Sequence, residues 1–320
     1  MDFKALIWQY GQGKRDFSRL DLQRIELIRE TLIEIDFSRT SLEWANLSGT
    51  NLTGADLNRA DLIYARLLSA KLIDADLTGA NLQNADLSWV DLENATLASA
   101  DLRGANLKQV NLSYADLTSA NLSGANLTGA ILNGAKLNRV DLSYANLSGV
   151  DLSGAYLSRS DLSYVDLREA DLTNANLYKA DISQSKLHNT DFQEAFLQGA
   201  NFSRANLKGA NLGGASLREV NLSLVNLSEF NLQRVTRVGE IDLSSANLQK
   251  ANLQGAILRH ANLGYGLLYC TFLNHCILRG ANLIDASFRG CNFRNANFRN
   301  SNISEINLTE ATMPDGSIHP

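Results

Sequence analysis

Cysteine and histidine are scarce in this chain, with three Cys and four His among 320 residues. So low and odd a number of cysteines argues against a disulfide framework, and neither residue type shows the spacing of a metal site. We therefore expect reduced thiols, surface histidines, and no metal ion or other cofactor.

Long apolar runs and catalytic signatures are also missing. No run approaches the ~18 apolar residues of a membrane-spanning helix, and the N-terminus lacks the apolar segment of a secretory signal. A Gly-rich phosphate loop, a nucleophile elbow and a paired-His motif are all absent. These absences predict a cytoplasmic protein that is not an enzyme, has no catalytic residue and does not bind membranes.

What the chain does contain is a strict period of five. From Phe17 to Leu232 every fifth residue is Leu, Ile or Phe, which makes 44 consecutive sites. Five residues turn an α-helix by about 500°, so successive sites would point about 140° apart and form no stripe. In a continuous strand an odd period would send successive sites to opposite faces. The period therefore predicts short extended segments separated by corners, which wind into a solenoid.

The composition of each repeat separates inward from outward positions. The residue two before the central Leu shares its face and is mostly Ala or Val, as a narrow interior requires. The residue directly before the central one is Asp or Asn at 32 of the 44 sites, and the two that follow are mostly small or polar. We call these five places the small, Asx, central, first turn and second turn positions. Cys276 and Cys291 occupy the inward small position, whereas Cys270 faces outward.

This pattern resembles the A(D/N)LXX consensus of the pentapeptide repeat family over residues 15–313. The resemblance implies an all-β fold, namely a right-handed, quadrilateral parallel β-helix with four repeats in each coil. Counted in this way, the chain has about 15 coils and forms one elongated domain. Residues 1–14, with apolar side chains at helical spacing after a capping Asp, predict a short helix that covers the first coil. Residues 314–320 are a C-terminal tail.

The period slips once, after Leu232. The next central residues are Leu243, Leu248 and Leu253, so the segment 233–241 holds one residue too many. We interpret it as a one-residue insertion that forms a bulge, from which Arg234 and Arg237 project as candidate partner-binding residues.

Residues 20 apart stack on one side of such a solenoid. One side keeps Asp or Asn at the Asx position almost throughout, and after the insertion we expect it to continue through Asp242, Asn262, Asn282 and Asn302. The same side carries four aromatic residues, Trp44, Tyr64, Tyr144 and Tyr164. Stacked rings are either simple sheet neighbours or a binding surface.

The sharpest departure from the pattern lies between residues 257 and 277, where apolar residues take the Asx position beside tyrosines and arginines. The residues are Ile257, Tyr265, Leu267, Tyr269, Phe272 and Ile277, with Arg259 and Arg279. We interpret them as an exposed apolar belt that contacts a protein partner, the alternative being drift in a loosely specified coil.

Charge bears on the known functions of the family that the chain resembles. Some members imitate duplex DNA and act on type II topoisomerases, which requires dense negative charge. Here the net charge is −5, and residues 250–300 carry six basic residues against one acidic residue. Binding of nucleic acid itself is also disfavoured, because no continuous basic stripe exists and the isoelectric point is about 5.5.

Both ends of the repeat region resemble cyanobacterial members of the family, such as the regulator of heterocyst differentiation. The similar segments are GKRDF at 13–17 and MPDGSIH at 313–319. This likeness implies a cytosolic scaffold that works by binding another regulatory protein. The prediction is a non-enzymatic, regulatory protein–protein interaction scaffold, with a second copy bound through the C-terminal region as a further candidate partner. A DNA-mimicking gyrase inhibitor or protector is the alternative.

Overall fold

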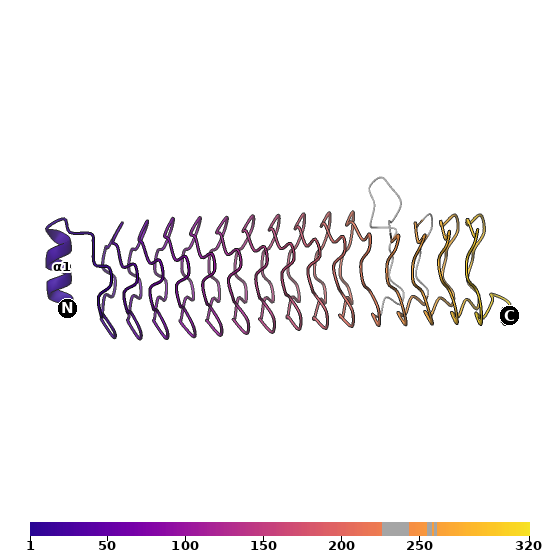
Figure 1. Ribbon diagram of the computed structural model, residues 1–320, viewed down its shortest axis with the longest axis horizontal. Coiled ribbons are helices and arrows are strands. Elements are labelled where there is room, and N and C mark those ends of the chain that lie inside the picture. Colours follow the sequence, from indigo (N-terminus) through magenta and orange to yellow (C-terminus); the bar gives the residue numbers. More distant parts are fainter. Residues whose placement is uncertain (226–242, 255–257, 259–260) are drawn as a thin grey trace. The chain divides into compact units, whose positions relative to one another are not determined.

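The computed structural model describes residues 1–225, 243–254, 258 and 261–320, which belong to two compact units, Met1–Ala170 and Asp171–Pro320. Helix α1 (Phe3–Gly11) is the one helix found among these residues (Figure 1). The remaining regular structure consists of bridges of single residues, all parallel except one near the C-terminus, so the described chain contains no longer strand. One continuous domain over 15–313 remains a prediction, and the units are described in turn.

Within each unit the chain advances by one coil every 20 residues. In the N-terminal unit Asp16 is bridged to Asp36, which is bridged to Asp56, and three further bridges of the same spacing fall between each such pair. Four bridged positions in 20 residues give each coil four sides. The predicted arrangement of four repeats to a coil is therefore present in both units.

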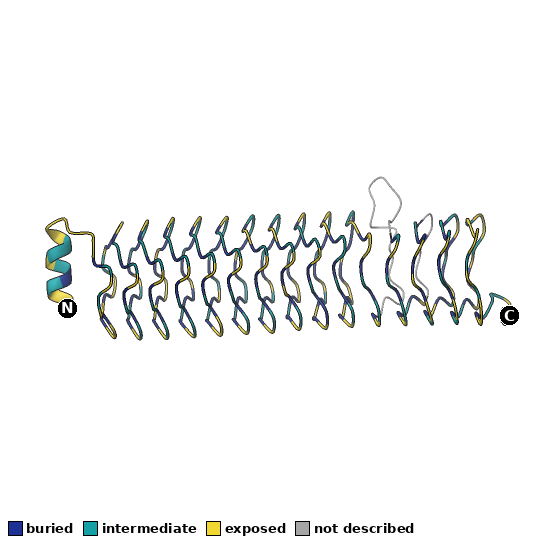
Figure 2. Ribbon diagram, viewed as in Figure 1, coloured by how far each residue is buried: buried dark blue, intermediate teal, exposed yellow. Residues whose placement is uncertain are grey.

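The interior is formed by the central and small positions of the described repeats, except in the last coil, where the central Ile303 is 54% exposed. All central residues from Phe17 to Leu222 are buried, and so are small residues such as Ala125 (Figure 2). Several polar residues at the small position donate to the carbonyl of a central residue one coil earlier, whereas Ser160 donates to Leu157 O of its own turn. Thr271 Oγ1 donates to Leu248 O at 2.7 Å in the first of these ways. A narrow interior can therefore hold a hydroxyl without leaving it unpaired.

The backbone hydrogen bonds of one repeat explain why Asp and Asn recur. Three of the five N–H groups bond to neighbouring coils, and the fourth closes the turn at the corner. The N–H of the first turn position is left over, and the Asx side chain accepts it. In the repeat around Leu47 these bonds run from Asn46 N to Ile25 O, Leu47 N to Arg66 O, Gly49 N to Leu68 O, Thr50 N to Leu47 O, and Ser48 N to Asn46 Oδ1. The Asx residue therefore completes the pairing of backbone donors.

The corner itself is a four-residue turn with positive φ at its third residue, which is the second turn position. Gly49 has a φ of 68° there, but Arg39 at 57° and Trp44 at 60° adopt the same conformation. Positive φ at the third residue alone is the pattern of type II turns. Side chains at the second turn position therefore project from the corners.

The register across residues 226–242 differs from the prediction. The one-residue insertion placed at 233–241 lies outside the described residues, but its flanks are described. A parallel bridge joins Asn221 to Asn247, 26 residues further along the chain, where a regular coil has 20. Six extra residues, not one, lie between these partners. The predicted continuation through Asn262 is therefore wrong, because the side of Asn221 continues through Asn247 and Leu267.

Each end of the described chain has its own closing structure. Asp2 caps α1 by accepting a 2.8 Å hydrogen bond from the Ala5 N–H. Leu6 of α1 is buried, and the Tyr10 hydroxyl donates to Ile33 O of the first coil at 3.0 Å. In the C-terminal unit residues 314–320 turn back, and an antiparallel bridge joins Thr312 to Ile318.

Candidate interaction surfaces

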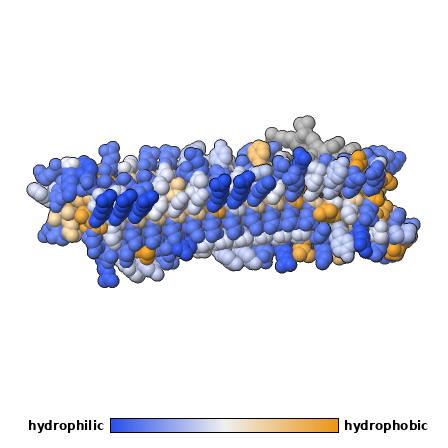
Figure 3. All heavy atoms as spheres, in the orientation of Figure 1, coloured by the Kyte–Doolittle hydropathy of each residue, from blue (hydrophilic) through white to orange (hydrophobic). Residues whose placement is uncertain are grey.

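Three of the predicted apolar residues meet at one corner of the C-terminal unit. Leu267 lies on one side, Phe272 lies on the next, and Tyr269 lies at the first turn position between them. Their exposed fractions are 47%, 52% and 40%. We call these three residues the 267–272 corner. Figure 3 shows apolar side chains gathered over the C-terminal coils.

The ladder neighbours of the 267–272 corner are polar. Leu267 is bridged to Asn247 and Ser287, and Phe272 to Asn252 and Asn292. Leu and Phe thus interrupt columns of polar side chains at outward positions. These apolar side chains contribute nothing to the interior, so their burial requires another surface.

The structure does not bring all the predicted belt residues together. Ile277 and Arg279 lie on the side after that of Phe272, where Ile277 is half-buried and bridged to Asn297. Tyr265, 65% exposed, lies at the corner preceding the side of Leu267. The described belt residues therefore extend over three consecutive sides of the coil instead of forming one patch. Ile257, Arg259, Arg234 and Arg237 lie outside the described residues.

The surroundings of the 267–272 corner carry little free charge. The side-chain hydrogen bond between Tyr269 and Cys270 raises the pKa of Tyr269 above its usual value, so the phenol is neutral at pH 7. Arg289 occupies the next rung after Tyr269 and forms a 3.3 Å ion pair with Glu310. That hydrogen-bonded contact raises the pKa of Arg289. The corner is thus an uncharged surface, and the charges of the neighbouring Arg289 and Glu310 offset each other.

Isolated apolar residues also occur at the Asx position elsewhere. Ile131 and Tyr156 of the N-terminal unit and Phe196 of the C-terminal unit are 44%, 51% and 59% exposed. Single exposed apolar side chains are ordinary on protein surfaces. The 267–272 corner is distinguished by having three of them on adjoining positions.

The N-terminal unit carries a second kind of surface, built from its corners. The rings of Trp44 and Tyr64 stack at 4.4 Å between centroids, and those of Tyr144 and Tyr164 at 4.7 Å. This confirms that residues 20 apart are ladder neighbours on that side. The sequence alone indicated the rings and the stacking of arginines 20 residues apart, but the pairing of each ring with the arginine five residues before it was missed, although the recurring six-residue motif could have revealed it.

Chemical groups for catalysis or metal binding do not gather in the parts that the structure describes. No cluster of three or more His, Cys, Asp or Glu able to hold a metal ion is found there. The three cysteines are free thiols, and burial raises the pKa of Cys291 to about 12. That thiol is therefore protonated at neutral pH and is a weak nucleophile. Among the described helices none is both long and apolar enough to cross a membrane.

A four-sided solenoid with five-residue sides and Asx-capped turns defines a class of repeat protein. The family model described as "Pentapeptide repeats (8 copies)" matches residues 16–54, 35–69, 70–109, 85–124, 120–159, 151–189, 185–223, 195–234, 238–265 and 276–313. The chain belongs to the pentapeptide repeat family, which confirms the resemblance seen in the sequence. The family implies a right-handed quadrilateral β-helix.

Several solved structures of the family are similar to the chain. HetL, a protein involved in heterocyst differentiation regulation from the cyanobacterium Nostoc sp. strain PCC 7120, is 28% identical over 100% of both chains, with a TM-score of 0.28. Full-length QnrB1, a plasmid-mediated fluoroquinolone resistance protein, is 16% identical over 63% of this chain and 91% of its own, with a TM-score of 0.34. A protein of the Arabidopsis thaliana thylakoid lumen is 30% identical over 39% and 69%, with a TM-score of 0.18. No curated protein matches the chain.

Proposed function

We propose that this protein is a non-enzymatic scaffold of about 15 coils that binds a regulatory protein in the cytoplasm. The observation that carries the proposal is the 267–272 corner, where Leu267, Tyr269 and Phe272 are exposed among polar ladder neighbours. An uncharged aromatic and aliphatic corner fits the apolar centre of a protein interface, in which aromatic side chains are enriched.

The regulatory role, in a cyanobacterium and in heterocyst differentiation, rests on the similarity of segments 13–17 and 313–319 to cyanobacterial members of the family. Arg279, beside Ile277 on the next side, supplies a charge at the edge of the proposed contact. Ile257, Arg259, Arg234 and Arg237 remain proposed members of the binding surface on the basis of the sequence.

The proposal is tested with the variant Leu267→Asn/Phe272→Asn, which returns both Asx positions to the usual residue. Burying the two side chains would contribute on the order of 3 to 6 kcal/mol, so their loss should weaken binding by two decades or more. Affinity capture from a cyanobacterial lysate, followed by calorimetry with the purified partner, measures the loss. The matched control is Ile131→Asn/Phe196→Asn, which removes equally exposed but isolated apolar residues. Equal affinity of both variants for the partner would refute the proposal.

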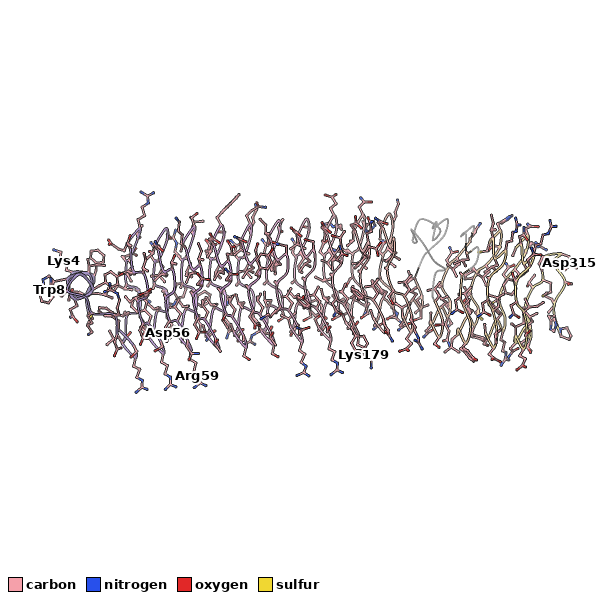
Figure 4. All side chains as sticks on the ribbon, turned by 90° about the horizontal axis from the view of Figure 1, so that it is seen from above. Lys4, Trp8, Asp56, Arg59, Lys179 and Asp315 are labelled. Carbon is pink, nitrogen blue, oxygen red and sulfur yellow. The ribbon has the colours of Figure 1, made fainter. Side chains whose placement is uncertain are left out.

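The alternative is a mimic of duplex DNA that acts on gyrase, and the N-terminal unit offers one observation in its favour. Asp16, Asp36, Asp56 and Asp76 form an uninterrupted ladder of carboxylates. Arginines stand beside this ladder, however, and a shallow hollow between the two is lined by both charges. Figure 4 shows Arg59 projecting beyond Asp56. A gyrase supercoiling assay that responds to the protein would favour mimicry over the scaffold.

A further inference from the structure

A six-residue motif recurs four times in the N-terminal unit. It reads Arg, any residue, Ser or Asp, Leu, any residue, Trp or Tyr, and its copies are residues 39–44, 59–64, 139–144 and 159–164. The copies form two pairs, each pair being 20 residues apart and therefore stacked in adjoining coils. The pairs are separated by five coils, or about 24 Å at 4.8 Å per coil.

The motif places an arginine and an aromatic residue at opposite corners of the same side. Its Arg occupies the second turn position before the side, and its Trp or Tyr occupies the second turn position after it. We call this the motif side, with an arginine rim (Arg39, Arg59, Arg139 and Arg159) and an aromatic rim (Trp44, Tyr64, Tyr144 and Tyr164). Both rims belong to the N-terminal unit.

Both rims are exposed to solvent. The aromatic residues are 52%, 42%, 66% and 45% exposed along the chain. None of the four arginines forms an ion pair with a residue of the described ranges. Like charges on adjoining rungs of a ladder destabilise each other, so each arginine pair is unfavourable by itself. The neighbouring Asp ladder offsets part of this cost at Arg39, and a compensating group on another molecule would offset more.

We propose that the motif side is a self-association surface, on which a second copy of this chain packs about a two-fold axis parallel to the coil axis of the N-terminal unit. Rotation about such an axis brings the arginine rim of each copy opposite the aromatic rim of the other. Because the axis is parallel to the coil axis, each coil lies opposite the same coil of the second copy. Arg39 then faces Trp44 of the second copy, and Arg139 faces its Tyr144, in both directions. A guanidinium group and the aromatic ring over which it lies attract each other, most strongly when water is excluded.

The residues between the two motif pairs allow close approach. Between the pairs the arginine rim carries Gly79, Ser99 and Ser119, and the aromatic rim carries Asn84, Gly104 and Gly124. All six side chains are small or absent, and a Cβ added at Gly124 would meet nothing within 4 Å. In the first coil Arg19 would face Arg24 of the second copy, so the contact ends at the next coil. A two-fold axis across the coils is excluded, because it would oppose arginine to arginine along the whole rim.

Other occupants fit the motif side less well. A polyanion would pair with the arginine rim but would also meet the carboxylates of Asp61, Asp141 and Asp161 between the rims. The contact is about 29 Å long and only a few residues wide, smaller than a standard interface. We therefore expect a reversible dimer in the micromolar range or weaker.

Sedimentation equilibrium of the full chain tests the proposal. The variant Tyr144→Arg/Tyr164→Arg opposes arginine to arginine and should weaken the dimer at least tenfold. Adding Arg139→Tyr and Arg159→Tyr exchanges the two rims, restores the pairing and should restore the dimer. The matched control is Trp89→Ser/Tyr114→Ser, because Trp89 and Tyr114 are 58% and 59% exposed at corners that do not border the motif side.

Circular dichroism shows that each variant is folded before its association is measured. Absence of dimer in the parent at hundreds of micromolar, loss without restoration by the rim exchange, or equal loss in the control would each overturn the proposal. A dimer that survives all motif-side variants but disappears in Leu267→Asn/Phe272→Asn would overturn it in favour of self-association through the C-terminal unit. The motif-side variants leave the 267–272 corner intact, so failure of this proposal is distinguishable from failure of the proposed function.

Discussion

The two units share the four-sided coil and its inward central and small positions, but their surfaces differ. Residues 1–170 carry 22 acidic and 16 basic residues, a net charge of −6, whereas residues 171–320 carry 12 and 13, a net charge of +1. Bridges follow one another every five residues in the N-terminal unit, while one coil of the C-terminal unit is lengthened by six residues. Apart from the lengthened coil, the pattern of inward positions is shared, so the charge difference is a property of the two surfaces.

Regular and irregular surfaces in these units suggest different kinds of contact. The N-terminal unit repeats its motif at fixed coil spacings, which suits a partner with the same spacing. The C-terminal unit concentrates Leu267, Tyr269 and Phe272 at one corner, which suits a single apolar contact. A repeat scaffold gains specificity where it departs from its own pattern.

The largest expected effect is the unfolding of one unit while the other stays folded. Leu127→Asp places an unpaired charge in the interior of the N-terminal unit, where Leu127 is fully buried. We expect a loss of stability on the order of 3 to 5 kcal/mol. Because coils contact only their neighbours, the C-terminal unit should stay folded. Thermal denaturation followed by circular dichroism measures the loss, and limited proteolysis identifies the surviving unit.

The outward control for this experiment is the adjacent Thr128→Asp, which should change stability by less than about 0.5 kcal/mol. Leu278→Asp makes the same change in the C-terminal unit, where Leu278 is also fully buried. If Leu127→Asp and the parent melt at one temperature, the inward assignment of the central position is wrong.

The interior and the Asx column were predictable because they depend on the phase of the period. Each backbone N–H has the same partner in every coil, so a residue such as Asn46 could be placed from one repeat alone. The register beyond residue 232 was not predictable in this way. The period shows that Leu243 is a central residue, but it does not show how many repeats the lengthened coil contains. Six extra residues are one residue plus one complete repeat, so an insertion of one and an insertion of six give the same sequence pattern.

The candidate site was predicted only in part for the same reason. Leu267, Phe272 and Ile277 were assigned outward positions, which the structure confirms. Their grouping was incomplete, because consecutive Asx positions lie on consecutive sides of the coil. Ile277 is therefore turned away from the side of Leu267. The relation between the arginine rim and the aromatic rim escaped notice because each Arg belongs to the repeat before the one that holds its aromatic partner.

A smaller gain of stability is expected when the C-terminal unit is made more like the N-terminal one. At Leu267 the repeat lacks the Asx side chain that elsewhere accepts the N–H of the first turn position. Leu267→Asn should supply this acceptor to the Tyr269 N–H and stabilise the isolated protein by about 1 kcal/mol. Urea denaturation measures the change. The reverse control, Asn126→Leu, removes the acceptor of the 3.1 Å bond from the Thr128 N–H and should destabilise by a similar amount.

Deleting the six extra residues of the lengthened coil should change the free energy of unfolding only slightly. Deletion of residues 233–238 leaves Leu232 followed by Gly239, Glu240, Ile241, Asp242 and Leu243, which is one complete repeat. The spacing between Asn221 and Asn247 then returns to that of a regular coil. We expect stability to change by less than about 1 kcal/mol, because the entropy of loop closure depends weakly on loop length. A loss of several kcal/mol would show that the segment is structural, whereas weakened partner binding alone would assign Arg234 or Arg237 to the contact.

The smallest expected effect concerns the acid stability of the N-terminal unit. Arg103 donates to Asp101 at 2.6 Å, and this side-chain hydrogen bond lowers the pKa of the Asp101 carboxyl below its usual value. A carboxyl whose folded pKa is depressed stabilises the protein above its unfolded pKa, and this contribution is lost as the pH falls through the folded pKa. In Arg103→Gln the pKa of Asp101 should rise toward 3.8, so the variant should lose less stability on acidification than the parent. Carboxyl titration by nuclear magnetic resonance measures the shift. The control is Lys108→Gln, whose Lys forms no ion pair within the described coils, and an equal titration of Asp101 in both variants would contradict the assigned role of Arg103.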